Sequence, residues 1–459
     1  MSRLHAGAGL LLAVLLTACA PPLPVQRTLA EQVTMPDAWR TAAPAAAPIR
    51  IDWWRQAGDE ALNGLVDRAL AHNLDIALAA ARVQEARAQE AVARAALRPS
   101  VDASLGASRA RSVSPFGTPS LATGEQPQLL VAYELDLFGR VRQQTEAARQ
   151  GLLQTQYAQD SARLAVAAAA VNGYVTLRAL DQRLRVLRET LTTREESLRH
   201  ARERVASGYS SQQEVAQARA ELESVAQQIP AVQAGIERQE HALALLSGQP
   251  PAAIARGKPV GALTLPAVNA EQPSALLRRR PDITQAEAQL AATDAQLAVA
   301  RAQFLPQIRL QASLGRVFSS ALADPIDVWS LGGSLLAPLF HGGQLQGQFD
   351  AAAARRDQAA LAYQKTVLTA FKEVEDNLST IAHLGAQQQA LQRQSDAANE
   401  ALRHATARYL EGYSSLLERI DAQRQVLAVD LAMVQLQADG LQARVGLHQA
   451  LGGGWQTPP

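Results

Sequence analysis

The stretch Ala-Val-Ala-Arg-Ala at residues 91–95 recurs at residues 298–302, and a proline follows each copy at the same distance. A second pair of matching stretches begins at His200 and His404 and ends with Gly-Tyr-Ser-Ser in both copies. Matching landmarks in the same order at a nearly constant offset indicate an internal twofold repeat. The sequence therefore predicts one repeat over residues 59–247 and a second over residues 274–452, joined by a proline-rich linker at 248–273.

A heptad pattern fills most of each repeat. Apolar residues at alternating spacings of three and four run from Leu177 to Val205, interrupted only by Arg194, and resume after Gly208. A period of 3.5 residues predicts long coiled-coil helices. A helix over residues 139–205 would be on the order of 100 Å long at 1.5 Å per residue. Pro230 is expected to kink the helix that returns from it.

Between these helices the period changes to two, which predicts strands at about 100–113 and 127–138 and, in the second repeat, at about 306–318 and 328–340. Each strand has an apolar and a polar side and is long enough to cross a bilayer when tilted. A pair of soluble hairpins is the alternative, but it leaves the apolar sides uncovered. Four strands are too few to close a barrel in lipid, whereas three chains would supply twelve. A homotrimer is therefore expected.

The start of the chain has the form of an export signal. Basic residues precede an apolar run that is too short to span a bilayer, and residues 1–18 are predicted to be removed as a signal peptide. The sequence Leu-Thr-Ala-Cys at residues 16–19 resembles the bacterial lipoprotein cleavage box, which implies a lipoprotein with an N-acyl diacylglycerol lipid, palmitate included, on Cys19. An ordinary buried cysteine is the alternative. Residues 19–58 are interpreted as a tether and 453–459 as a C-terminal tail.

Composition excludes several classes of protein. The 459 residues contain 44 basic and 43 acidic side chains, which gives no electrostatic reason to expect a nucleic-acid partner. One cysteine cannot form an internal disulfide or a cysteine-rich metal site, and no metal site is expected. His200 and His404 are copies of each other without a neighbouring nucleophile motif, so no catalytic residue is predicted and the chain is not expected to be an enzyme.

Four motifs resemble the TolC-like outer-membrane factor family, in its lipoprotein branch associated with multidrug (RND-type) efflux. They are Tyr-Glu-Leu-Asp-Leu-Phe-Gly-Arg at 133–140, Leu-Leu-Arg-Arg-Arg-Pro-Asp-Ile at 276–283, Ala-Pro-Leu-Phe-His-Gly-Gly at 337–343 and Ala-Leu-Gly-Gly-Gly-Trp at 450–455. The resemblance implies an α+β fold, in which an all-α coiled-coil periplasmic barrel continues into a transmembrane antiparallel β-barrel. A homotrimer with four strands per chain forms both.

The resemblance also implies a function. The trimer would be the outer-membrane channel of a tripartite efflux system, embedded in outer-membrane lipid and extending into the periplasm. It would connect, through a periplasmic adaptor (membrane fusion) protein, to an inner-membrane pump and conduct small molecules such as drugs or other toxic compounds, including antibiotics. Nothing in the chain identifies the cargo or the specific adaptor and pump. An exit duct for protein secretion or metal efflux, and a coiled-coil scaffold lipoprotein without a pore, are the alternatives.

Site residues follow from the resemblance at the two helix tips. The positions that match the family's adaptor-docking site are Gly208, Tyr209, Ser210, Gly412, Tyr413 and Ser414, although the glycines would also serve the turns alone. The positions that match the acidic periplasmic gate are Glu418, Asp421, Glu214 and Tyr409. Threefold symmetry would turn each carboxylate into a ring that attracts cations. Ser414 stands where some relatives carry a basic partner, so the gate would be weaker or use Arg419.

Overall fold

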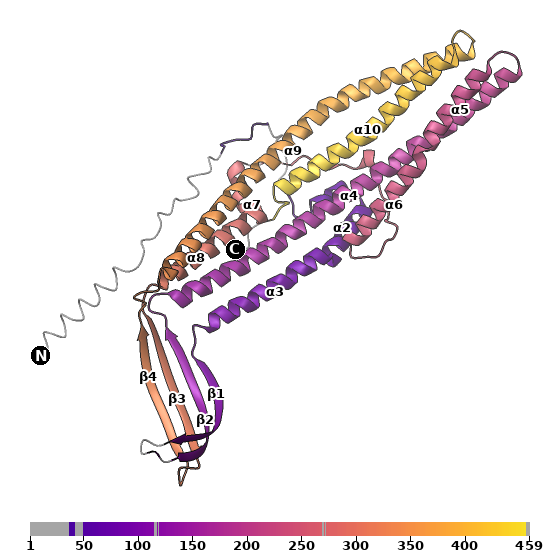
Figure 1. Cartoon of the computed structure of the whole chain (residues 1–459). Helices are drawn as coiled ribbons and strands as arrows, with labels where there is room; N and C mark the ends of the chain where they lie inside the picture. Colours follow the sequence, from indigo (N-terminus) through magenta and orange to yellow (C-terminus); the bar gives the residue numbers. More distant parts are fainter. Residues whose placement is uncertain are drawn as a thin grey trace. The chain divides into compact units, whose positions relative to one another are not determined.

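A computed structural model describes residues 36–41, 49–113, 117, 119–268, 270 and 272–455 (Figure 1). The predicted signal peptide and Cys19 lie outside the described residues. The helices and strands follow one another as η2 (Trp53–Ala57), α2 (Glu60–His72), α3 (Leu74–Ala95), β1 (Ser100–Val113), β2 (Pro119–Leu135), α4 (Arg140–Ala206), α5 (Gln212–Ala226), α6 (Gln228–Leu246), η3 (Val260–Ala262), η4 (Pro273–Ala275), α7 (Leu276–Arg279), α8 (Pro281–Ala302), β3 (Gln307–Ser319), β4 (Ile326–Leu336), α9 (Gln344–Leu410) and α10 (Leu416–Ala450).

The chain divides into two compact units. The first contains residues 81–157 and 284–365, which hold all four strands and the helical segments next to them in sequence. The second contains residues 34–80, 158–283 and 366–459, with the remaining helices and the linker. Each unit therefore draws on both sequence repeats, because a strand pair and a helical hairpin occur once in each.

The long helices match the heptad pattern. Helices α4 and α9 each have 67 residues, so each is on the order of 100 Å long. The predicted kink near Pro230 is a break between α5 and α6, at Gln227. Proline has no N–H for the carbonyl of Ala226, and its ring clashes with that carbonyl, which explains why α5 ends there. The second repeat has no proline at this place, and α10 runs unbroken for 35 residues.

The four strands form one antiparallel sheet in the order β1-β2-β3-β4 (Figure 1). Residues paired directly across antiparallel strands point to the same side. One row of the sheet pairs Ala103 with Leu129, Leu129 with Leu314 and Leu314 with Trp329. Leu314 and Trp329 are 60% and 77% exposed, so this apolar side is bare within one chain.

The opposite side of the sheet is polar. Ser313 and Ser330 face each other there with their hydroxyl oxygens 2.8 Å apart, and the side chain of Gln126 donates to that of Gln128. The alternation of two faces that the sequence predicts is therefore present in the sheet.

Two strand ends differ from the expectation. β2 begins at Pro119, well before the expected start near 127, because it pairs with β1 along its whole length. Pro127 does interrupt the pairing of β2 with β3, whose register skips residues 126 and 127. β4 ends at Leu336 instead of near 340, since Pro338 has no N–H to continue a ladder.

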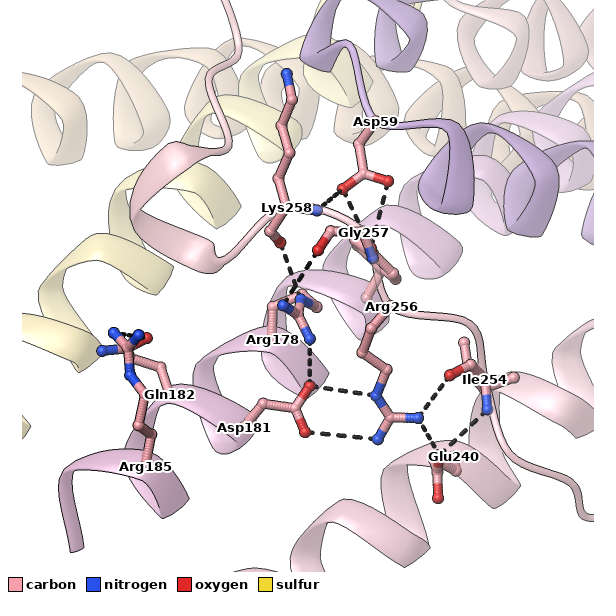
Figure 2. A network of polar contacts seen from close by, with 11 residues as sticks. Asp59, Arg178, Asp181, Gln182, Arg185, Glu240, Ile254, Arg256, Gly257 and Lys258 are labelled. Carbon is pink, nitrogen blue, oxygen red and sulfur yellow. Dashed lines mark hydrogen bonds and ion pairs between the residues drawn. The ribbon is translucent and has the colours of Figure 1, made fainter. Parts of the chain in front are cut away.

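The predicted linker is held tightly against the helices of the second unit (Figure 2). Asp59 accepts hydrogen bonds from the backbone N–H of Leu62, which it caps, and from the backbone N–H of Lys258, at 3.0 and 2.7 Å. Tyr174 donates to the same carboxylate at 3.2 Å. Arg256 bridges Asp181 of α4 and Glu240 of α6. These contacts tie the linker to α2, α4 and α6 together.

An apolar core fills the same unit. Trp53, Leu65, Tyr174 and Leu243 are among its fully buried side chains and come from η2, α2, α4 and α6. None of the helices within the described residues combines the length and apolarity needed to span a bilayer.

Candidate functional site

Two equivalent turns form the helix tips of the second unit. Gly208 follows α4 with φ +77°, and Gly412 follows α9 with φ +81°. In both, the tyrosine after the glycine donates its backbone N–H to an arginine carbonyl near the helix end at 2.8 Å, Tyr209 to Arg204 and Tyr413 to Arg408. This left-handed C-terminal cap is a common use of glycine, because other residues are strained at positive φ.

The predicted docking residues form these turns, and the glycines and tyrosines among them are not packed against other parts of the chain. A Cβ built on Gly208 or Gly412 would meet no atom within 4 Å, so the backbone conformation alone accounts for both glycines within one chain. Tyr209 and Tyr413 are 79% and 75% exposed. The serines differ: Ser210 donates to Glu214 at 2.5 Å, whereas the hydroxyl of Ser414 is buried without a hydrogen-bond partner among the described residues.

The predicted gate residues fall into two groups. Glu418 and Asp421 lie at the start of α10, both exposed, and Arg408 of α9 approaches Glu418 to 3.9 Å. Glu214, at the start of α5, lies close enough to Tyr409 to influence its ionisation. No hydrogen bond or ion pair among the described residues joins these two groups.

Tyr409 is buried in a core between the two helix pairs. Its ring packs with Leu198, Leu416 and Ile420, and burial raises the pKa of its hydroxyl, to which the negative charge of Glu214 contributes. The guanidinium carbon of Arg204 lies 4.7 Å from the ring centroid and that of Arg419 lies 5.6 Å from it. Tyr409 therefore joins all four helices of the tip, since these residues belong to α4, α9 and α10 and the core includes Ala218 of α5.

Sequence reasoning missed a cluster of buried cations behind the tip. Arg194 is 2% exposed and donates to the side chain of Gln423, and its Nε has no hydrogen-bond partner among the described residues. Arg419 is 9% exposed, and its Nε and one terminal nitrogen have none. Burial lowers the pKa of both; the charge of Glu221 opposes this for Arg194, and the positive charges of Arg424 and Arg419 add to it. Neither makes an ion pair within the described part of the chain, and isolated buried cations are costly.

Arg424 lies next to these two arginines but is exposed and paired. Its guanidinium binds the carboxylate of Glu221 on α5, and this ion pair raises the pKa of Arg424. The sequence contained a signal for the cluster, because these residues break the repeat. Arg194 occupies a heptad seam position, and Arg419 corresponds to Val215 of the first repeat at the offset of the tip glycines.

Comparison with known proteins identifies the family. The model of the outer membrane efflux protein family matches residues 65–249 and 272–453. The chain belongs to the outer membrane efflux protein family. It is 36% identical to the pyoverdine export outer membrane protein OpmQ of Pseudomonas aeruginosa, over 97% of this chain and 96% of that protein. It is 34% identical to the outer membrane protein OprJ of the same species, over 97% and 95%.

The solved structure of the outer-membrane channel OprN has the same fold. The two structures match over 93% of this chain and 99% of the OprN chain, with a TM-score of 0.85 and 29% sequence identity. This efflux protein is therefore an outer-membrane component of an efflux system, extends into the periplasm and is not an enzyme. The resemblance to TolC-like outer-membrane factors and the predicted α+β fold of coiled-coil helices with four antiparallel strands are confirmed. The scaffold without a pore is not supported.

Proposed function

We propose that three copies of this efflux protein close one tube, with four strands from each. The sheet supports this assembly: one side is apolar and bare, the other is polar, and β1 and β4 are its edge strands. In lipid an unpaired edge leaves backbone groups without hydrogen bonds, so β1 of one chain pairs with β4 of the next. The apolar side then faces lipid and the polar side lines the lumen.

The periplasmic end of the tube is closed by Glu418 and Asp421. Both are exposed at the start of α10, three residues apart and therefore on one helix face. Threefold symmetry makes two rings of three carboxylates, which bind cations and repel one another without them. Glu214 and Tyr409 hold the neighbouring helix pairs together. Ser414 supplies no charge at its position, so Arg408, which approaches Glu418 to 3.9 Å, provides the positive charge at the gate.

Conductance of single channels in planar bilayers tests the gate. Replacing Glu418 and Asp421 with alanine together removes both rings, so conductance rises and block by divalent cations weakens. Asp439→Ala is a matched control, because Asp439 lies on the same helix and accepts a hydrogen bond from Gln435. Currents of the double variant equal to those of the control would refute the gate.

The exposed tip residues are the docking site of a periplasmic adaptor, which links the tube to an inner-membrane pump. Tyr209 and Tyr413 offer aromatic area at each tip, and the open space around Gly208 and Gly412 admits a second backbone. Tyr209→Ser with Tyr413→Ser leaves the glycine backbone untouched, and efflux should fall while assembled protein stays in the outer membrane. Undiminished efflux would limit these residues to forming the turns.

Cys19 anchors the mature chain through its lipid. The mass of the purified protein should include the lipid and lack residues 1–18, and Cys19→Ala should remove the lipid. An unmodified Cys19 in the mature protein would contradict the anchor.

The cargo is a small organic molecule delivered by the pump. The name of OpmQ, a relative that exports pyoverdine, supports this class. The observation that carries the function is the combination of family membership with a sheet that has one bare apolar side. Deletion of the gene should raise the sensitivity of cells to several unrelated compounds, and restoration of the gene should reverse it. Unchanged sensitivity and unchanged export would contradict an efflux role.

A further inference from the structure

A pocket lies in the first unit, where α3 ends and the sheet begins. Its volume is about 540 Å³. The polar residues that line it come from the turn after α3 and from β1, β2 and β3, and they are Arg98, Ser100, Tyr133, Glu134, Arg309 and Gln311. Three strands and a helix end thus supply one concave surface.

Most strand residues of the pocket belong to the polar side of the sheet, whereas Tyr133 and Leu310, which also line it, pair with each other on the apolar side. Ser100 pairs with Ala132, which in turn pairs with Gln311, and Glu134 pairs with Arg309 in the next row. Ser313 and Gly315 follow Arg309 and Gln311 on the same side, since side chains alternate along a strand. This is the side that faces the lumen in the proposed trimer.

The pocket has an excess of positive charge. Both carboxylate oxygens of Glu134 are bound by Arg140, at 2.7 and 2.8 Å, so its negative charge is already balanced. Arg309 lies across from Glu134 in the sheet, and its guanidinium donates to the neutral amide oxygen of Gln307 at 3.5 Å. Within the described residues, neither Arg98 nor Arg309 makes an ion pair. Two guanidinium groups therefore line the pocket without an anion.

Neutral donors complete the lining. The amide of Gln311 and the hydroxyl of Ser100 each offer hydrogen bonds beside the two arginines. Guanidinium groups bind carboxylate and phosphate oxygens in pairs of parallel hydrogen bonds. The two arginines are not a feature that both repeats share. In the other repeat, Leu305 corresponds to Arg98 and Asp102 corresponds to Arg309.

We propose that this pocket binds small anions, carrying carboxylate or phosphate groups, as they pass through the lumen. The proposal rests on the trimeric channel described above, in which three copies place six arginines around one level of the tube. Arginines around a water-filled passage with low-dielectric walls attract anions and raise their local concentration.

Reversal potentials in a KCl gradient test the pocket. Channels formed by the double variant Arg98→Gln with Arg309→Gln should show a chloride-to-potassium permeability ratio lower by about twofold or more. Citrate added to one side should block the wild-type channel more strongly than this variant. Asp102→Asn removes an acid from the same side of the sheet, one row beyond Ser100, and should shift the permeability ratio in the opposite direction.

Arg316→Gln is the matched control. Arg316 lies on β3, on the apolar side, and pairs with Asp327 at 2.6 Å, so its loss should leave the permeability ratio unchanged. Wild-type selectivity and citrate block in the double variant would overturn the proposal. Wild-type selectivity together with loss of co-purified phosphatidylglycerol would assign the pocket to lipid instead and also overturn it. If wild-type protein forms no channel at all, the proposed channel itself is contradicted.

Discussion

Arg419→Met should stabilise the packed helix tip, although it deletes a charged side chain next to the gate. Arg419 is 9% exposed, and two of its nitrogens have no hydrogen-bond partner among the described residues. Replacement of buried ionic groups by apolar side chains of similar volume is often neutral or stabilising by about 1–4 kcal/mol. The cation–π contact with Tyr409, at 5.6 Å, is lost and offsets about 0.5–1 kcal/mol of this.

The expected net change is a free energy of tip opening that rises by up to about 3 kcal/mol. Hydrogen exchange of the backbone amides at the start of α10 measures it directly, because these amides exchange when the tip opens. Exchange should slow, by up to about 150-fold. In planar bilayers the same variant should spend less time in the open state.

Arg424→Met is the matched control, one turn further along α10, and it should have the opposite sign. The side chain of Glu221 is only 11% exposed, and Arg424 is its ion-pair partner. Removal of that partner leaves a largely buried carboxylate uncompensated, which costs about 1–3 kcal/mol. Exchange should therefore be faster in this variant. Faster exchange in Arg419→Met, or changes of the same sign in both, would refute the reasoning.

Three further predictions concern the second unit. His448 is stacked on Trp53, and burial lowers its pKa to about 4 from 6.5. The neutral imidazole therefore contributes fully to the free energy of unfolding above pH 6.5, and about 3 kcal/mol is lost as the pH falls toward 4. Chemical denaturation at a series of pH values should show this loss in the wild type and not in His448→Phe. Asp59→Ala removes the acceptor of three hydrogen bonds, so amides of residues 254–262 should exchange faster, and unchanged exchange would contradict the network in Figure 2. Pro230→Ala should join α5 to α6 and protect the new amide at position 230, whereas continued rapid exchange there would show that the break has another cause.

The fold was largely predictable because its signals are periodic. Heptads over the long helices and alternation over the strands are visible in the sequence, and the tip glycines fix where the helices turn. The start of β2 was not predictable from Pro119 and Pro127, since both suggest a loop. Pairing with β1 determines where β2 begins, and the sequence of β2 alone does not show this pairing.

The positions of the predicted site residues were readable from the sequence mainly where they are exposed, with the buried Tyr409 as an exception. Glycine and tyrosine at the turns are a local pattern, and the structure places them there. The buried charges are different, because the contacts of Arg194 with Gln423 and of Arg424 with Glu221 join helices about 200 residues apart in sequence. Positions at which one repeat carries a charge and the other an apolar residue, such as Arg419 and Val215, are the signal that sequence reasoning left unused.

The number of chains in the assembled protein tests the central claim most directly. Native mass spectrometry of full-length protein released from detergent micelles should give a single assembly of three chains, because three sheets of four strands close one tube. Monomers as the only species, or an assembly of two or four chains, would contradict the account.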